Sequence, residues 1–187
     1  MSGVGHPGSA FRTKSQWGRV MLPGGAELLG PQPQEGTVAF WVCPAFDNDF
    51  VAERKNVALA YLMETDQNAT PSGYDEIGIY LNDGKLKARV GGKCSEIFMG
   101  EVPSPLVKGE WVHLALTWKP GERVLYVNGQ PVITNNKSYT APKLDGFPAT
   151  IGTHPSNMAM FAPGTYDEYR LYDRALTAEA IRQIMEN

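Results

Sequence analysis

The chain has 187 residues, of which 42% are hydrophobic, and it carries a formal net charge of −3 at pH 7. This length suits a single domain that buries a core without metal or disulfide staples. The scattered Lys and Arg argue against a nucleic-acid partner, because phosphate binding requires a basic surface. The densest basic stretches, residues 54–55 and 85–89, are interpreted as solvated edges of strands.

No apolar run approaches the roughly 20 residues of a membrane span. Residues 1–16 are rich in Gly and Ser, are expected to be loose, and lack the apolar segment of a secretion signal. We therefore expect one domain over residues 1–187, either cytoplasmic or cut from a longer exported chain.

The first half of the chain alternates short apolar runs with turn-forming residues. Residues 17–29 suit two short strands around a Pro-Gly-Gly turn, and residues 37–43 form a near-continuous apolar run that predicts a buried strand. Asp47, Asn48 and Asp49 are expected to form a polar loop. Further strands are predicted over residues 57–63, 77–81, 86–90 and 95–102, with a hairpin turn at residues 82–84.

Residues 109–132 predict two strands joined by a tight turn at residues 119–122, followed by a second turn at Asn128-Gly129. In the first strand, Val112, Leu114, Leu116 and Trp118 alternate with Trp111, His113, Ala115 and Thr117. Neither set is charged, so both faces of this strand are expected to be covered.

Short strands are also expected over residues 149–152 and 165–172, and the one clear helix over residues 177–185. Thr177 can cap this helix, and Ile181, Ile184 and Met185 share one of its faces. About a dozen short strands with one terminal helix indicate an all-β, antiparallel two-sheet sandwich.

Three segments resemble the laminin-G-like, or concanavalin A-like, jelly-roll domains. Gly109 begins Gly-Glu-Trp-Val-His-Leu-Ala-Leu-Thr-Trp, which with the later Leu-Tyr-Val-Asn-Gly resembles the family's central hairpin. Thr37 begins Thr-Val-Ala-Phe-Trp-Val, similar to an early family strand. Gly164 begins Gly-Thr-Tyr-Asp-Glu-Tyr-Arg-Leu-Tyr-Asp-Arg-Ala-Leu-Thr, similar to its closing segment, although Ala180 stands where the family often has Glu.

The resemblance implies a jelly-roll sandwich used mainly for binding, as an appended module of extracellular or surface proteins. The partner would be a glycan, a protein ligand or another domain of the same polypeptide. The related pentraxins bind calcium through acids in two loops, but residues 152–158 here contain no carboxylate, which argues against a pentraxin-style site. Fold does not fix function, so the ligand stays open.

No catalytic pattern is recognisable. A retaining glycosidase needs two carboxyl groups about 5 Å apart, and strand alternation would turn Asp167 and Glu168 toward opposite faces. The chain lacks a Gly-x-Ser-x-Gly motif, and its three His show no zinc spacing. His113 is expected to be a packed structural residue. We therefore expect no enzyme activity, with an unrecognised glycosidase or lyase as the least favoured alternative.

One structural calcium is the only cofactor considered. Asp167 is the best single candidate ligand, because family members often place a calcium-linked acid near this strand. Asp47 and Asp49 could complete the site, although ordinary loop tips are the simpler interpretation. Cys43 and Cys94 could form one disulfide, and buried free thiols are the alternative.

The sequence predicts that any ligand contacts loops or a concave sheet. The candidate ligand-binding residues are Tyr74, Tyr139, His154, Asn157 and Phe161, in the loops over residues 66–74, 139–147 and 154–161. The apolar residues 158–161 form either an interface or a lid that packs back on the sandwich.

Two hypotheses result. The first is a non-catalytic recognition module that binds carbohydrate. The alternative is a structural, adhesion or protein-interaction domain without a sugar ligand.

Overall fold

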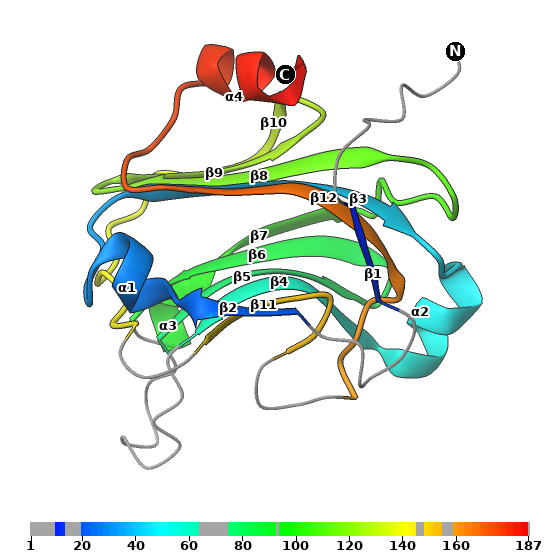
Figure 1. The fold of residues 1–187 in the computed structure, drawn as a ribbon. Coiled ribbons are helices and arrows are strands. Elements are labelled where there is room, and N and C mark those ends of the chain that lie inside the picture. Colours follow the sequence, from blue (N-terminus) through cyan, green and yellow to red (C-terminus); the bar gives the residue numbers. More distant parts are fainter. Residues whose placement is uncertain are drawn as a thin grey trace.

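The computed structural model describes residues 10–13, 20–63, 75–92, 94–144, 148–154 and 159–186. They form two antiparallel sheets packed face to face as a β-sandwich, as the sequence predicts (Figure 1). We call the first sheet sheet A. Its strands, in their order across the sheet, are β1 (Phe11–Thr13), β12 (Gly164–Tyr172), β3 (Gly36–Pro44), β8 (Val112–Lys119), β9 (Glu122–Val127) and β10 (Gln130–Asn135).

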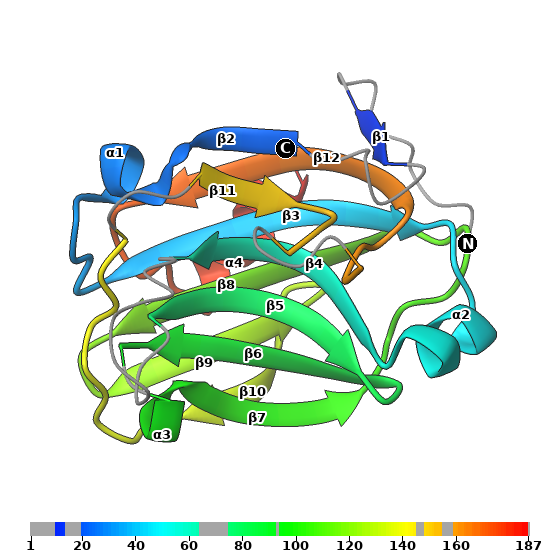
Figure 2. The ribbon, with the colours of Figure 1, turned by 90° about the horizontal axis from the view of Figure 1, so that it is seen from below.

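The second sheet, sheet B, faces the viewer in Figure 2. Its strands are β2 (Val20–Gly24), β11 (Pro148–Ile151), β4 (Asn56–Met63), β5 (Glu76–Asn82), β6 (Lys85–Gly91) and β7 (Phe98–Pro103). Four short helices accompany the sheets in the described residues: α1 (Gly25–Leu29), α2 (Asn48–Arg54), α3 (Cys94–Ile97) and α4 (Ala178–Glu186).

Strand alternation builds the core between the sheets. From β8, Leu114, Leu116 and Trp118 point inward and are fully buried, as predicted from residues 109–132. The opposing sheet contributes alternate residues of β5 and β6, which are Ile77, Ile79, Leu81, Leu86, Ala88 and Val90. Every second residue of these two strands therefore lies on the outer face of sheet B.

The predicted hairpin turns are confirmed by backbone geometry. Asn128 and Gly129 both have positive φ, 48° and 72°, which a two-residue turn between twisted strands requires. Asp83 and Gly84 do the same between β5 and β6, with φ of 50° and 72°.

The outer face of β8 is also covered, as its lack of charge predicts. Ala115 packs with Ala39, Val124 and Tyr126 beneath α4, whose Ile181 is fully buried there. Thr177 caps α4 by accepting a hydrogen bond from the Ala180 N–H at 3.2 Å. This helix covers part of the outer face of sheet A (Figure 1).

Three helices replace structures that the sequence analysis predicted as strand or loop. Residues 26–29, expected in a strand, lie in α1, and residues 95–97, expected to begin a strand, lie in α3 before β7. Residues 48–49, expected in a loop, begin α2, because the Asp47 carboxylate accepts from the Phe50 N–H at 3.2 Å and caps the helix.

A bulge in β12 overturns the predicted alternation around the acid pair. Both Tyr166 and Tyr169 pack against the core, so Asp167 and Glu168 lie between two inward residues instead of on opposite faces. Glu168 has φ of 50°, which is typical of a bulge residue. Arg170 pairs with the Glu168 carboxylate and donates to the Ile184 carbonyl at 2.8 Å, which ties the bulge to α4.

Candidate functional site

The outer face of sheet B carries aligned rows of polar and aromatic side chains. Register sets each row across β4, β5, β6 and β7 in turn, because directly paired strand residues lie on the same face. One row pairs Ala58, Tyr80, Lys87 and Glu101. The next row pairs Tyr61, Gly78, Arg89 and Phe98.

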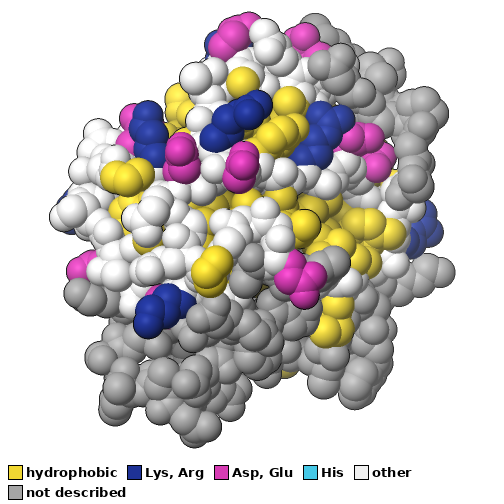
Figure 3. Space-filling model, turned by 60° about the vertical axis from the view of Figure 1, so that its left-hand side comes forward, with side chains coloured by type: hydrophobic (Ala, Val, Ile, Leu, Met, Phe, Trp, Pro, Cys, Tyr) yellow, Lys and Arg dark blue, Asp and Glu magenta, His cyan; other side chains and the backbone are white. Residues whose placement is uncertain are grey.

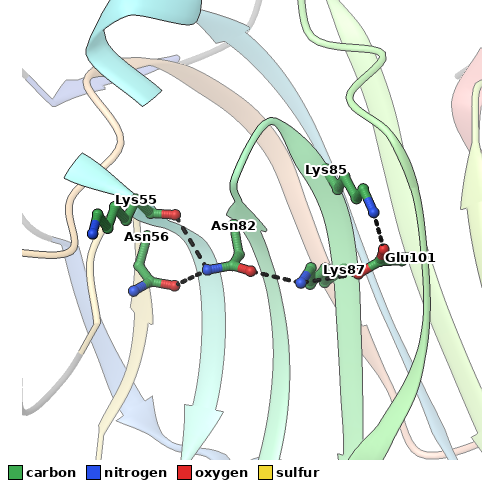
Figure 4. Close-up of polar contacts among 6 residues, drawn as sticks. All are labelled: Lys55, Asn56, Asn82, Lys85, Lys87 and Glu101. Atoms are coloured by element: carbon green, nitrogen blue, oxygen red, sulfur yellow. Dashed lines mark hydrogen bonds and ion pairs between the residues drawn. The ribbon is translucent and has the colours of Figure 1, made fainter. Parts of the chain in front are cut away.

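A hydrogen-bonded chain of polar groups crosses this face (Figure 4). The Asn82 side-chain amide donates to Asn56 Oδ1 at 2.8 Å, and Asn82 Oδ1 accepts from Lys87 Nζ at 2.6 Å. Lys87 Nζ lies 2.9 Å from the Glu101 carboxylate, which also pairs with Lys85. These contacts hold Lys87, a long side chain on a central strand, in one position.

Two cations of β6 also lie over aromatic rings. The Arg89 guanidinium is 4.7 Å from the centroid of the Tyr80 ring, and Lys87 Nζ is 5.9 Å from that of Phe98. Phe98 is 47% exposed, whereas Tyr80 is buried beneath its neighbours. Phe98 therefore offers an open aromatic ring beside held polar groups.

Arg89 is oriented by a buried acid. Its Nη1 lies 3.1 Å from the Glu76 carboxylate, and Glu76 is only 3% exposed. Burial raises the pKa of the Glu76 carboxyl, and the neighbouring Arg89 charge opposes that rise. Removing Arg89 would leave a buried carboxylate without its counter-charge, which is strongly destabilising.

A hollow of about 430 Å³ opens among these side chains, a volume in the usual range for small-ligand sites. It is lined by residues of four strands and of α3, namely Asn56, Tyr80, Asn82, Lys87, Arg89, Ile97 and Phe98. We call it the β6 hollow.

A cluster of rings adjoins the hollow on the same face. The Tyr61 ring lies 6.3 Å from Tyr80 and 4.7 Å from His154, measured between centroids. It crosses Gly78, where an added Cβ would lie 2.8 Å from the ring, so only glycine fits this position. Burial lowers the pKa of His154 to about 4, with Arg89 adding to the effect.

The structure separates the predicted ligand-binding residues. Tyr139 is half-buried with its ring 4.5 Å from the Arg123 guanidinium and its hydroxyl 3.3 Å from the Gln34 carbonyl. Phe161 is buried against Phe50 of α2, 5.5 Å between ring centroids. Arg123 lies at one end of the strands and α2 at the other, roughly 25 Å apart along a nine-residue strand.

Of the other candidates, His154 lies beside the β6 hollow, whereas Tyr74 and Asn157 are outside the described residues. The end of residues 158–161 packs back on the sandwich: Met160 contacts the cluster of Ala58, Tyr61 and Tyr80, and Phe161 is buried. The whole loop over residues 66–74, and residues 145–147 of the loop over residues 139–147, lie outside the described residues.

The three candidate calcium ligands do not gather in one cluster of the described residues. Asp47 caps α2 and pairs with Lys108 at 3.3 Å, which holds the pKa of its carboxyl below its usual range. Asp49 lies in the first turn of α2 and Asp167 in the bulge of β12, where it accepts from the Glu168 N–H at 2.9 Å. Within the described ranges, no three His, Cys, Asp or Glu side chains gather as metal ligands.

Cys43 is a half-buried free thiol, so of the two alternatives for this residue the structure has the free thiol. It lines a larger hollow, about 610 Å³, together with Arg12, Lys108 and the backbone near Gly164. Burial raises the pKa of the Cys43 thiol, partly offset by Arg12, so it stays protonated at neutral pH. This second hollow lacks an aromatic wall and a network of held polar groups, so we favour the β6 hollow.

Sequence reasoning missed the residues of the β6 hollow. Residues 85–89 were interpreted as a solvated strand edge, but β6 lies between β5 and β7, and Lys87 is mostly buried. The signal was present: Lys85, Lys87 and Arg89 alternate with Leu86, Ala88 and Val90, which places three cations on one face. The partners on β4, β5 and β7 become visible only from the register.

The surface around α1, on the left-hand side of Figure 1, carries side chains of mixed charge. In Figure 3, basic and acidic side chains alternate around a band of apolar ones, with no continuous field of one sign. Leu28 of α1 is the most exposed apolar side chain of that helix, at 49%. Within the described residues, no helix has the length and hydropathy to span a membrane.

The sequence matches the family described as the concanavalin A-like lectin/glucanases superfamily over residues 16–182. No curated protein sequence matches the chain. Among solved structures, it is similar to a heptameric SAP-like pentraxin from Limulus polyphemus, with 18% identity and a TM-score of 0.58. That match covers 82% of this chain and 70% of the pentraxin.

Two further matches are with parts of larger chains. The receptor-binding domain of botulinum neurotoxin D has 11% identity and a TM-score of 0.66, covering 95% of this chain and 43% of that one. A Bacteroides ovatus protein, named for an inferred carbohydrate-binding role, has 18% identity and a TM-score of 0.58, covering 83% and 42%. This chain thus spans less than half of either, and such identities concern the fold alone.

Proposed function

Since the chain belongs to the concanavalin A-like lectin/glucanase superfamily, we propose that it is a non-catalytic module that binds carbohydrate in the β6 hollow. The observation that carries this proposal is the exposed Phe98 ring beside a row of held polar groups on one sheet face. Sugar rings present apolar C–H faces that pack on aromatic rings, and their hydroxyls both donate and accept hydrogen bonds.

The hollow is built for this kind of ligand. Polar groups that line the same hollow as Phe98 come from Asn56, Asn82, Lys87 and Arg89. Their side chains are held by mutual contacts, so binding costs little conformational entropy. The family and the carbohydrate-related name of the Bacteroides ovatus neighbour support the same ligand class.

The proposal includes an extracellular or surface location and attachment to further domains, which the family resemblance suggests. We also propose that the protein has no catalytic activity. Hydrolysis of a polysaccharide by the wild type, abolished by Asp167→Ala or Glu168→Ala, would contradict it. A structural calcium is a separate proposal without a donor set in the described residues, and a higher Tm in millimolar calcium than in EDTA would support it.

An array of immobilised glycans tests the ligand class, and Phe98→Ala tests the place. We expect binding to at least one glycan and a loss of about tenfold or more in affinity for Phe98→Ala, because the apolar contact is removed. Leu28→Ala is the matched control, since Leu28 is equally exposed but lies on α1. Silence across the array would instead favour a structural or protein-interaction domain.

A further inference from the structure

The β6 hollow has an uneven electrostatic lining. Two of its lining side chains, Lys87 and Arg89, are cationic, and none is acidic. The chain as a whole is negative, with a formal net charge of −3. The two neighbouring carboxylates, Glu76 and Glu101, pair with these cations from outside the lining. The two cations thus face the hollow, while their counter-charges lie outside its lining.

The polar row also fixes which hydrogen-bonding groups remain for a ligand. Lys87 can only donate, so the Asn82 oxygen must face it and the Asn82 amide nitrogen must face Asn56. That nitrogen donates to both Asn56 Oδ1 and the Lys55 carbonyl. Asn56 must therefore accept through its oxygen, which turns its own N–H groups away from Asn82 (Figure 4).

The hydrogen-bonding groups that remain for a ligand are therefore mostly donors. Among the described contacts, Lys87 uses two of its three N–H groups, on Asn82 and Glu101, and the amide nitrogen of Asn56 uses none. Arg89 donates from Nη1 to Glu76, and its side chain also hydrogen-bonds Tyr80, so the remaining donor capacity lies mainly on Lys87 and Asn56. A ligand that matches this inventory is rich in acceptors and negatively charged.

Building on the proposed function, we infer that the β6 hollow selects acidic sugars, in which a carboxylate or a sulfate ester accepts from Lys87, Arg89 and Asn56. A neutral sugar would pack on Phe98 equally well but would offer the cations only uncharged hydroxyl acceptors, which make weaker hydrogen bonds than a carboxylate or a sulfate ester. The preference is electrostatic in part, so it decreases as ionic strength rises.

Isothermal titration with three oligosaccharides of equal length tests this inference: a uronic-acid oligomer, a sulfate-ester oligomer and a neutral one. We expect one or both acidic oligomers to bind about tenfold more tightly than the neutral one at low salt, with the advantage reduced at 0.5 M NaCl. The two acidic arms distinguish carboxylate from sulfate as the recognised group.

Asn56→Asp is the diagnostic variant, because it keeps the shape and the acceptor for Asn82 while replacing the outward donors with a negative charge. We expect it to lose the preference for acidic oligomers. Asn136→Asp is the matched control, since it makes the same charge change on an exposed residue after β10 and should keep the preference. Unchanged Tm values would show that both variants fold.

Three results would overturn the inference in distinguishable ways. Equal affinity for neutral and acidic oligomers would remove the acidic preference but leave carbohydrate binding intact. Binding of none of the three, together with silence on the glycan array, would remove the proposed function itself. Acidic preference retained in Asn56→Asp would show that the selective groups lie elsewhere.

Discussion

Arg89 has its surroundings set entirely by strand register. Pairing places Tyr80 and Glu76 on β5 beside it and Phe98 opposite it on β7. Tyr80 supplies an aromatic ring, Glu76 a buried carboxylate and Phe98 an exposed apolar surface. At this scale the site depends on a small number of side chains whose positions come from the sheet, as is usual for sites supported by regular elements.

His113 gives a residue-scale prediction about pH. It is 2% exposed, its ring lies 5.2 Å from that of Trp41, and burial, with Arg170 nearby, lowers its pKa from 6.5 to about 4. Between pH 6.5 and 4 the unfolded chain binds a proton that the folded chain does not. The contribution of neutral His113 to the free energy of unfolding should therefore be fully present above pH 6.5 and be lost as the pH drops toward 4. The loss is on the order of 1–3 kcal/mol.

Urea denaturation at pH 7 and pH 5 measures this effect in the wild type and in His113→Gln. His154 titrates in the same direction in both proteins, so the difference between their pH slopes isolates His113. The wild type should lose more stability than the variant on acidification. Equal slopes would show that His113 is not held neutral in the folded protein.

The helix α4 illustrates how an element is held in place. It is anchored by its cap at Thr177, by the Arg170 contact to its last turn and by Ile181, which is fully buried against sheet A. We expect Ile181→Ala to lower the free energy of unfolding by about 2–5 kcal/mol, because it leaves a cavity under the helix.

Ile184→Ala provides the comparison for α4, since Ile184 is only half-buried. Ile184→Ala should lower the free energy of unfolding by clearly less than Ile181→Ala does. Thermal unfolding followed by circular dichroism measures both variants. Equal costs for the two substitutions would mean that α4 does not pack on sheet A through Ile181.

The individual strands, turns and helices show how much of this fold could be predicted from the sequence. Alternation at residues 112–118 and the turns at Asn128-Gly129 and Asp83-Gly84 were predicted correctly, because they depend on local periodicity and backbone conformation. The helices α1, α2 and α3 were missed, since they span only four to seven residues and carry weak periodicity. The bulge at Glu168 was missed because strict alternation was assumed.

The candidate site was harder to predict than the fold for a physical reason. Its residues come from β4, β5, β6 and β7, and their neighbours across the sheet are set by register, which the sequence does not reveal locally. Of the predicted ligand-binding residues, His154 lies beside this face through its contact with Tyr61, whereas Tyr139 contacts Arg123. Burial raises the pKa of Tyr139 to about 12, partly offset by Arg123.

At the scale of the whole molecule, the two sheets have different outer faces. α4 packs over part of sheet A, and the outer face of sheet B carries the β6 hollow. The buried Arg123 joins the sheets at one end, donating to the Val90 and Glu96 carbonyls at 2.6 and 2.7 Å. A sandwich held in this way presents the β6 hollow on rigid strands.

Mapping amide chemical shifts during titration with a glycan identified on the array shows directly where the ligand binds. We expect the shifts to concentrate in β4, β5, β6 and β7 around Asn56, Asn82, Arg89 and Phe98. Shifts confined instead to sheet A, or to the end of the sandwich around α1 and Tyr139, would contradict binding in the β6 hollow.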